Sequence, residues 1–359
     1  MKLLFDAERL RNPHSGLGQF CRAMGDALLR HREPGDEVTF VVPPAQVELF
    51  GPGASYKPVA WWQRYWSPAN VDVWHATHQD AWIRPSRGAR VVLTIMDLNF
   101  LERRDYSSAR KARRLAAVQR KIDRASAVAT ISAYTASVVR EHLRITDIPL
   151  SVIHLGNPVE AANAPPIDVP APLSLRALGN GPFFLFVGVL HPKKNVHTLV
   201  PLLGDFPGWR LVLAGPDDHP YAREVREQAR ALGLGDRLVM PGAVDESTKR
   251  WLYANCRALL FPSLSEGFGL PVVEAMGFGK PVFLSRLTSL PEIGGSTAWY
   301  FDSFARESMV AVVRRGLDDF AAHPERTAGL LEAASRFSWD RAATEYWLLY
   351  DEARRAPPR

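Results

Sequence analysis

The strongest constraint on the fold is an alternation of short apolar segments with amphipathic segments, which occurs twice along the chain. In the first half, the apolar segments that predict strands lie at residues 2–5, 37–43, 71–76, 89–97 and 126–132. The segments with helical spacing of apolar residues lie between or after them, at 16–31, 107–124 and 133–144. Strands that are apolar along nearly their whole length and alternate with helices indicate a parallel sheet covered on both faces.

A proline-rich segment separates this first series from a second one. Residues 158–172 hold five prolines and show no periodicity, which is typical of a linker. The apolar segments of the second series lie at 183–188, 209–215, 237–242, 258–262 and 281–285. We therefore predict two Rossmann-like, doubly wound α/β domains, at 1–160 and 173–337, joined by a linker at 161–172. Because ligands bind beyond the carboxyl ends of parallel strands, we expect the site in the cleft between the domains.

The composition agrees with a soluble two-domain protein. The chain has 359 residues, which suits two domains of roughly 100–200 residues each. Its apolar segments are shorter than the roughly 18 residues of a membrane span, and its N-terminus becomes charged too early for a signal peptide. The two cysteines, Cys21 and Cys256, have neither metal-binding spacing nor a disulfide pattern. We expect a cytoplasmic protein, either free or peripheral on the inner face of the cytoplasmic membrane.

The positive charge of the chain is concentrated in one segment. The formal net charge is +6, and residues 102–124 alone carry nine Lys or Arg against three acids. Five of the ten tryptophans lie shortly before it, in residues 61–82. A basic amphipathic helix next to tryptophans suits the surface of an anionic membrane. The predicted membrane contacts are residues 103–124, Trp61, Trp62 and Trp66.

Two other interpretations of this basic segment stand beside membrane binding. Leu115, Val118 and Ile122 line one face of the predicted helix, so the segment is equally well explained as a surface helix beside tryptophans of the core. Nucleic acid is a poorer partner, because no recognition motif accompanies the charge.

Residues 258–280 carry the chemistry of the second domain. An apolar strand ends near Pro262, a loop follows, and Pro271 suits the first turn of a helix. This places Glu266 on the loop and Glu274 in the first helical turn. The backbone N–H groups around Gly267–Leu270 then lie at the positive end of the helix, where a phosphate binds. Since a carboxylate repels a phosphate, we expect the two glutamates to bind neutral hydroxyl groups on either side of it.

The string "FPSLSEGFGLPVVEAMGFGKPV" resembles the E-x7-E donor-site signature of retaining glycosyltransferases of family 4, which have the two-domain GT-B fold. The resemblance implies that Glu266 contacts the transferred sugar and that Glu274 holds the ribose of the nucleotide. It also assigns donor-binding positions along the sugar and the diphosphate, namely Gly267, Phe268, Gly269 and Leu270. The alternative is an ordinary strand–turn–helix corner with incidental surface acids, since the bare spacing is common.

Two further segments of this domain resemble the same family. In "FVGVLHPKKN", Lys193 and Lys194 correspond to the basic pair that neutralises the donor diphosphate, although Val189 replaces the family's common arginine. We expect these lysines at the start of a helix, a position that disfavours lysine unless an anion binds there. "PGAV" resembles the loop that contacts the nucleobase through Val244, and a plain turn explains it equally well. Residues 338–355 resemble the family's closing helix, which packs back on the first domain.

The first half of the chain matches the family less completely. In "SGLGQF", Gly16 and Gly18 resemble the glycine loop that approaches the donor phosphate and the acceptor. Cys21 stands where a dinucleotide-binding motif would need its third glycine, so that kind of site is disfavoured. In "TIMDLNF", Asp97 corresponds to the family's His-Asp pair, with Met96 in place of the histidine. His75 or His78 is an alternative for that contact, although a lone histidine is more often structural.

These features together predict a retaining, metal-independent hexosyltransferase. The resemblance implies a nucleoside diphosphate sugar of the GDP-mannose type as donor and a glycan or lipid-linked acceptor, in synthesis of cell-surface polysaccharide or lipopolysaccharide such as O-antigen. The catalytic residues would be Lys194, Glu266 and Asp97, with neither a cofactor nor a metal, because the chain has no D-x-D motif. The alternatives are a GT-B-fold sugar-nucleotide epimerase or hydrolase, and a non-catalytic partner in a polysaccharide-assembly complex.

Overall fold

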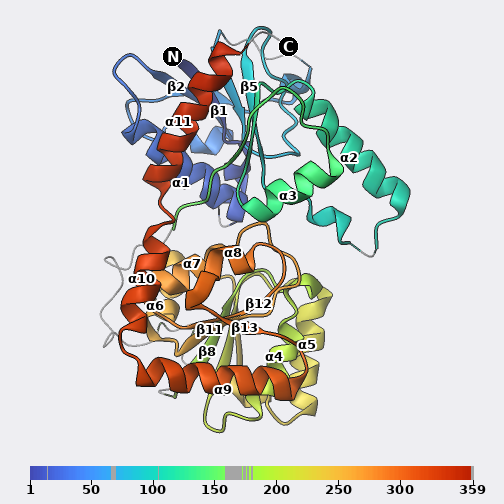
Figure 1. Ribbon diagram of the computed structural model, residues 1–359, viewed down its shortest axis with the longest axis vertical. Coiled ribbons are helices and arrows are strands. Elements are labelled where there is room, and N and C mark those ends of the chain that lie inside the picture. The colour runs from blue at the N-terminus through green and yellow to red at the C-terminus, as the bar shows by residue number, and fades with distance from the viewer. Residues whose placement is uncertain are drawn as a thin grey trace. The chain divides into compact units, whose positions relative to one another are not determined.

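The computed structural model describes residues 1–13, 15–65, 70–103, 105–157, 172, 175, 178 and 181–356. It divides into two compact units (Figure 1). The N-terminal unit comprises Met1–Pro158 with Phe337–Arg359, and the C-terminal unit comprises Val159–Arg336. Trp66 and residues 161–171 of the predicted linker lie outside the described residues.

The N-terminal unit contains a sheet in which all pairings are parallel and seven described strands take the order β3-β2-β1-β4-β5-β6-β7. The strands are β1 Lys2–Asp6, β2 Glu37–Val42, β3 Ser55–Pro58, β4 Val73–Ala76, β5 Arg90–Ile95, β6 Ala127–Thr130 and β7 Leu150–Val152. Its α-helices are α1 Gly16–Arg30, α2 Ser108–Ile122, α3 Ala133–His142 and α11 Trp339–Arg355. The two edge strands, β3 and β7, were not predicted from the sequence. They are only partly buried, so their sequences lack the long apolar runs of the central strands.

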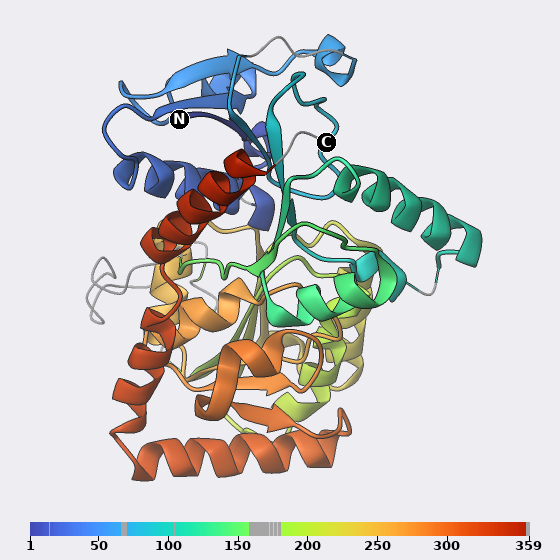
Figure 2. The same cartoon turned by 45° about the horizontal axis from the view of Figure 1, so that its top comes forward.

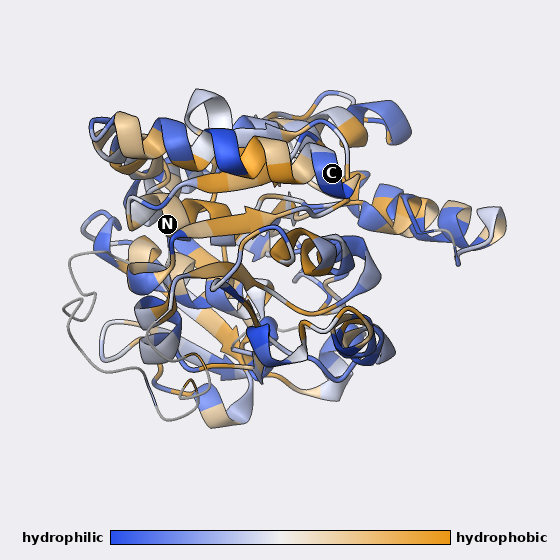
Figure 3. Cartoon of the chain, turned by 90° about the horizontal axis from the view of Figure 1, so that it is seen from below, coloured by the Kyte–Doolittle hydropathy of each residue, from blue (hydrophilic) through white to orange (hydrophobic). Residues whose placement is uncertain are grey.

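The C-terminal unit contains a second parallel sheet, of six described strands in the order β10-β9-β8-β11-β12-β13. The strands are β8 Phe183–Val187, β9 Arg210–Ala214, β10 Leu238–Gly242, β11 Ala258–Phe261, β12 Val282–Ser285 and β13 Trp299–Phe301. The α-helices are α4 Leu199–Leu203, α5 Pro220–Ala231, α6 Glu246–Asn255, α7 Leu270–Gly277, α8 Leu290–Gly294, α9 Arg306–Ala322 and α10 Arg326–Ser335. The strands of both units are mostly hydrophobic, whereas the helices carry hydrophilic residues as well (Figure 3). The prediction of two doubly wound α/β domains is therefore confirmed.

Both sheets reverse their strand order at one place, which defines where a ligand can bind. The reversal falls between β1 and β4 in the N-terminal unit and between β8 and β11 in the C-terminal unit. At such a switch point the connections leave toward opposite faces of the sheet, and a crevice opens beyond the carboxyl ends of the two central strands. The loops after these four strands are therefore the places to look for function.

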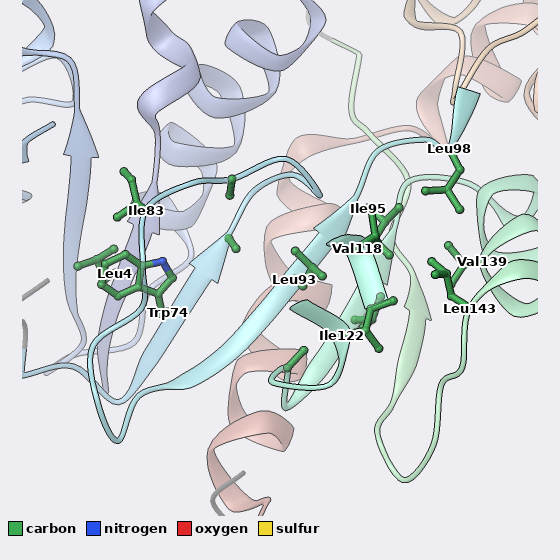
Figure 4. Packing of buried hydrophobic residues seen from close by; sticks show 14 of the residues in the cluster. Leu4, Trp74, Ile83, Leu93, Ile95, Leu98, Val118, Ile122, Val139 and Leu143 are labelled. Atoms are coloured by element: carbon green, nitrogen blue, oxygen red, sulfur yellow. The ribbon is translucent and has the colours of Figure 1, made fainter. Parts of the chain in front are cut away.

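The core of the N-terminal unit includes the apolar face of the basic segment. Val118 and Ile122 of α2 pack in one cluster with Leu93 and Ile95 of β5 (Figure 4). Leu115 is partly buried against the same cluster. Burial of each such side chain contributes about 1.5–3 kcal/mol to stability. The apolar face of α2 is thus committed to the core, as expected for a surface helix, and the predicted membrane contact of the charged face stays a prediction.

A buried polar network attaches α11 to the N-terminal unit, and the helix lies alongside α1 in two views (Figures 1 and 2). His75 Nδ1 lies 2.6 Å from the hydroxyl of Tyr350, and His75 Nε2 lies 2.8 Å from Thr94 Oγ1. Thr94 Oγ1 lies 2.8 Å from the hydroxyl of Tyr346. Burial lowers the pKa of His75 to about 3, so its ring is neutral at physiological pH and bonds through both nitrogens. His75 is therefore a structural residue and not a candidate for sugar contact.

Candidate active site

Two loops meet at the switch point of the C-terminal unit. One follows β8 and holds Lys193 and Lys194, and the other follows β11 and holds Glu266. They are joined directly, because the backbone N–H of Leu264 donates to the carbonyl of Lys193 at 2.7 Å. The fold thus brings together two sequence segments that were predicted separately to bind the donor.

Lys194 and Glu266 form an ion pair at this edge of the sheet. The distance from Lys194 Nζ to Glu266 Oε1 is 2.5 Å, and the two side chains are 13% and 11% exposed. The ammonium also lies over the ring of Phe261, 5.4 Å from its centroid. Such a cation, partly withdrawn from water but still reachable, is suited to exchange its carboxylate partner for an incoming anion.

The local structure around the lysines differs from the prediction of a helix start. Lys193 and Lys194 lie in a 3-10 turn, Pro192–Lys194, and α4 begins only at Leu199. Asn195 ends the turn in the left-handed region, with φ of 58°, which interrupts the path into a helix. The argument from the dipole of an α-helix therefore does not apply to these lysines. Lys193 is exposed, and its carbonyl bond to the neighbouring loop fixes its position.

The loop from Glu266 to Gly269 is held in place by the segment before α8. Ser289 Oγ donates to the carbonyl oxygens of Glu266 and Phe268, at 3.2 and 2.8 Å. Gly269 caps α7 with φ of 114°, and a Cβ there would lie 2.9 Å from a methyl carbon of Leu290. Only glycine suits this turn. The side chain of Phe268 is 3% exposed, so it supports the loop from inside.

Glu274 lies deeper in the unit than the sequence suggested. It is the fifth residue of α7 and so belongs to the second turn, not the first, and it is 2% exposed. Lys249 Nζ lies 3.0 Å from Glu274 Oε1, and the hydroxyl of Tyr253 donates to Glu274 Oε2 at 2.5 Å. Both partners come from α6. The sequence analysis identified neither residue. Lys249 precedes Leu252 by three residues and Tyr253 by four, which places a lysine on the apolar, buried face of the helix, and this was a detectable signal.

The remaining predicted residue of this unit, Val244, follows β10 and is half-buried. The next residue, Asp245, accepts from the N–H of Thr248 at 2.7 Å and so caps α6. The loop with Val244 is therefore fixed at the same edge of the sheet, at the carboxyl end of β10. The same geometry is found in an ordinary loop that leads into a helix, so it does not by itself indicate a nucleobase site.

The predicted residues of the N-terminal unit have local structural roles. Ser15 caps α1 by accepting from the N–H of Gly18 at 3.1 Å. A Cβ on Gly18 would lie 2.2 Å from the carbonyl oxygen of Asn12, so packing against that loop demands this glycine. A Cβ on Gly16 would meet no atom of the described structure within 4 Å. Asp97 follows β5 and accepts from the N–H of Asn99 at 3.1 Å.

A buried charged cluster at the switch point of the N-terminal unit was not predicted. Glu8 Oε1 lies 2.8 Å from Arg9 Nε and 3.3 Å from His78 Nε2. Asp6 is fully buried, and its Oδ2 has no hydrogen-bond partner in the described part of the chain. Burial raises the pKa of Asp6 to about 7. An acidic residue directly after the apolar strand "KLLF" was the available signal.

In the part of the chain that the structure describes, no three His, Cys, Asp or Glu side chains gather as a metal site would require. Among the same residues, no helix is both long enough and apolar enough to cross a bilayer.

The fold and this site define a glycosyltransferase of the GT-B class. Residues 174–327, which lie in the C-terminal unit, match the family model described as glycosyl transferases group 1. The O-antigen chain mannosyltransferase B of Escherichia coli is 24% identical over 96% of this chain and 98% of that protein. The GDP-mannose:cellobiosyl-diphosphopolyprenol alpha-mannosyltransferase of Komagataeibacter xylinus is 33% identical over 44% of this chain and 42% of its own. The serotype-specific mannosyltransferase WbdA of E. coli is 30% identical over 45% of this chain, which spans only 20% of that protein.

Solved structures agree on the fold. Sucrose-phosphate synthase from Thermosynechococcus elongatus superposes with a TM-score of 0.75 and 18% identity, covering 98% of each chain. Anabaena HepE in complex with UDP and glucose superposes with a TM-score of 0.72 and 17% identity, covering 97% of this chain and 98% of that one. Similarity at this level of identity establishes the architecture alone.

Proposed function

We propose that this protein is a retaining, metal-independent mannosyltransferase that uses a nucleoside diphosphate sugar of the GDP-mannose type. The acceptor would be a glycan or lipid-linked glycan in O-antigen or related cell-surface polysaccharide synthesis. The observation that carries the proposal is the ion pair of Lys194 and Glu266, whose charged atoms lie 2.5 Å apart at the switch point. Glu274 lies on α7, the helix that begins just after the loop with Glu266. The full-length similarity to an O-antigen mannosyltransferase supports the choice of sugar and pathway.

Each residue of the site has a defined task in this proposal. Lys194, with Lys193 beside it, neutralises the charge that develops on the departing nucleoside diphosphate. Once the diphosphate forms an ion pair with the ammonium of Lys194, the carboxylate of Glu266 is free to accept a hydrogen bond from a hydroxyl of the transferred sugar. The backbone from Gly267 to Leu270 lies along the sugar and diphosphate, and Glu274 accepts the ribose hydroxyls. Val244 lines the nucleobase.

The N-terminal unit contributes the acceptor side. Gly16 opens α1 with no described atom above it, so a substrate can approach its backbone closely. Asp97 sits at the carboxyl end of β5, on the edge of the sheet where ligands bind in this type of fold. In a retaining reaction without a side-chain nucleophile, these residues orient the attacking hydroxyl while the leaving phosphate takes its proton.

The test begins with donor binding. A thermal-shift screen of the purified protein against GDP-mannose, UDP-glucose, dTDP-glucose and ADP-glucose should give the largest stabilisation with GDP-mannose, since a bound donor stabilises by mass action. Incubation of the selected donor with and without oligosaccharide acceptors should then give a glycosylated product whose anomeric configuration matches the donor. A new sugar nucleotide or free mannose formed without acceptor would replace this proposal with the epimerase or hydrolase. No stabilisation by any donor would refute it.

We further propose that the N-terminal unit docks on an anionic membrane through charge and exposed aromatics. Trp61 is 71% exposed and Trp62 is 39% exposed. On α2, Arg110, Arg113 and Arg120 are exposed, whereas the apolar face is buried. Each Lys or Arg near an anionic leaflet contributes about 1 kcal/mol.

Vesicle flotation tests this docking. The protein should float with vesicles of phosphatidylglycerol and phosphatidylcholine at low salt, and not with phosphatidylcholine alone. The double variant Arg113→Glu, Arg120→Glu should lose this binding, while Arg315→Glu, an exposed arginine on α9 of the other unit, should keep it. Failure of the wild-type protein to bind anionic vesicles would refute membrane docking without touching the enzymatic proposal.

A further inference from the structure

Each glutamate of the E-x7-E motif is paired with a lysine, but the two pairs differ in accessibility. The Lys194–Glu266 pair is partly exposed, as a ligand-exchangeable contact must be. The second pair is buried, with side-chain exposure of 8% for Lys249 and 3% for Glu274. Tyr253, whose hydroxyl completes this second group, is fully buried. Lys249 also lies 3.1 Å from Glu246, an exposed residue one turn earlier on α6.

The chemistry of this buried group keeps its parts in fixed protonation states. Burial alone would lower the pKa of Lys249, but the carboxylates of Glu274 and Glu246 outweigh that effect and raise it. Lys249 is therefore an ammonium ion throughout the physiological range. Burial and the neighbouring Glu274 carboxylate raise the pKa of Tyr253, so its hydroxyl stays protonated and donates a hydrogen bond to Glu274.

A buried ion pair needs an explanation other than stability. Well-packed apolar side chains of similar volume are often as stabilising as such a pair, because the cost of removing two charges from water offsets their attraction. What the group does achieve is orientation, because a cation holds one carboxylate oxygen and a hydroxyl holds the other. The carboxylate of Glu274 cannot rotate without losing both.

We propose that Lys249 and Tyr253 are positioning residues that orient the Glu274 carboxylate for the ribose of the nucleotide. An ionised carboxylate offers about four lone-pair sites, of which this group occupies two. The remaining two match the 2′- and 3′-hydroxyls of one ribose. This inference rests on the proposed function, in which Glu274 holds the ribose.

Nucleotide binding measured by calorimetry tests the inference without any acceptor or turnover. The probes are GDP and 2′,3′-dideoxy-GDP, or the UDP pair if the donor screen selects uridine. Wild-type protein should bind the ribose form about ten- to a hundredfold more tightly, as expected for hydrogen bonds to a charged group. Tyr253→Phe and Lys249→Met should lower the affinity for GDP toward that for dideoxy-GDP, and should leave the affinity for dideoxy-GDP nearly unchanged.

Three comparisons make the result decisive. Lys280→Met is the matched control, since Lys280 is a half-buried lysine of the same unit whose pKa is affected by the charges of Cys256 and Arg257 and not by that of Glu274. It should keep the wild-type discrimination. Lys249→Arg should restore part of what Lys249→Met loses, because it keeps a donor and a charge. Tyr253→Phe removes a single hydroxyl and decides the question if Lys249→Met does not fold.

The outcomes separate failure of the inference from failure of the proposed function. Equal losses for GDP and dideoxy-GDP, or unchanged discrimination in the two variants, would overturn the positioning role while leaving the enzyme assignment intact. Wild-type protein that binds GDP and dideoxy-GDP equally well would overturn the ribose assignment of Glu274, and the inference with it. Wild-type protein that binds neither nucleoside diphosphate would overturn the proposed function itself. In steady-state kinetics, the supporting result is a raised KM for the donor with a smaller change in kcat.

Discussion

Replacement of Asp6 by asparagine should stabilise this protein at neutral and alkaline pH. Asp6 ends β1 and is fully buried, and its Oδ1 accepts from the N–H of Glu8 at 3.1 Å. Burial is the main cause that raises its pKa from 3.8 to about 7, opposed by the hydrogen bond from the Glu8 backbone, assisted by the charge of Glu8, and opposed further by Arg9 and Lys121. Asparagine keeps the accepting oxygen of the Glu8 bond but never ionises.

The sign and size follow from proton linkage. Because the folded protein holds the proton more tightly than the unfolded chain, the carboxyl of Asp6 destabilises the fold increasingly as pH rises from about 4 to about 7. A difference of about three pKa units corresponds to about 4 kcal/mol, reached above pH 7. The advantage of Asp6→Asn over wild type should therefore be largest near pH 8 and shrink steadily as pH falls toward 4.

Urea unfolding of both proteins at several pH values between 4 and 8 measures this difference. The matched control is Asp123→Asn, an exposed aspartate at the end of α2, which should show no comparable gain. An Asp6→Asn variant that is no more stable than wild type at pH 8, or whose advantage does not change with pH, would refute the reasoning. The first result would mean that a buried charge at Asp6 has a partner that compensates it.

Two further predictions concern the donor site and the closing helix. Lys194→Ala and Glu274→Ala should each lower kcat/KM for transfer by about 10²–10³, the effect of losing one preorganised charge contact, and wild-type rates in both would refute the site assignment. Tyr350→Phe should reduce the free energy of unfolding by about 1–3 kcal/mol, because it leaves a buried ring nitrogen of His75 unpaired. An unchanged melting temperature would contradict that role for Tyr350.

The sequence predicted those structural features that depend only on residues close together along the chain. The order of most of the strands follows from local apolar periodicity, whereas the short edge strands β3, β7 and β13 were not predicted. The loop placement of Glu266 follows from one proline and two glycines. The partner of Glu274 does not, because Lys249 is 25 residues away and meets it only when α6 packs beside α7. The 3-10 turn at Lys193 was missed for another reason, since it depends on a left-handed Asn195.

Steric constraints imposed by backbone that is distant in the sequence could not be predicted from the sequence either. Gly18 was assigned to the donor site on its spacing from Gly16, yet a loop carbonyl at Asn12 is what excludes a side chain there. In the same way, a helical wheel of α2 shows an apolar face but not what covers it. The sheet of the N-terminal unit covers it, which leaves the charges as the part that can meet a membrane.

The attachment of α11 to the first unit also fixes the order in which the protein can mature. His75 and Tyr350 are 275 residues apart, so the first sheet is synthesised long before the helix that covers it. At translation rates of roughly 5–20 residues per second, the surface around His75 stays uncovered for about 15–55 s, until α11 has been synthesised. The second unit can complete its fold within that interval, whereas the first unit lacks α11 until the end of synthesis. A nascent chain of this protein therefore finishes its N-terminal half last, and a truncation of the final turns would damage the half from which it is most distant in sequence.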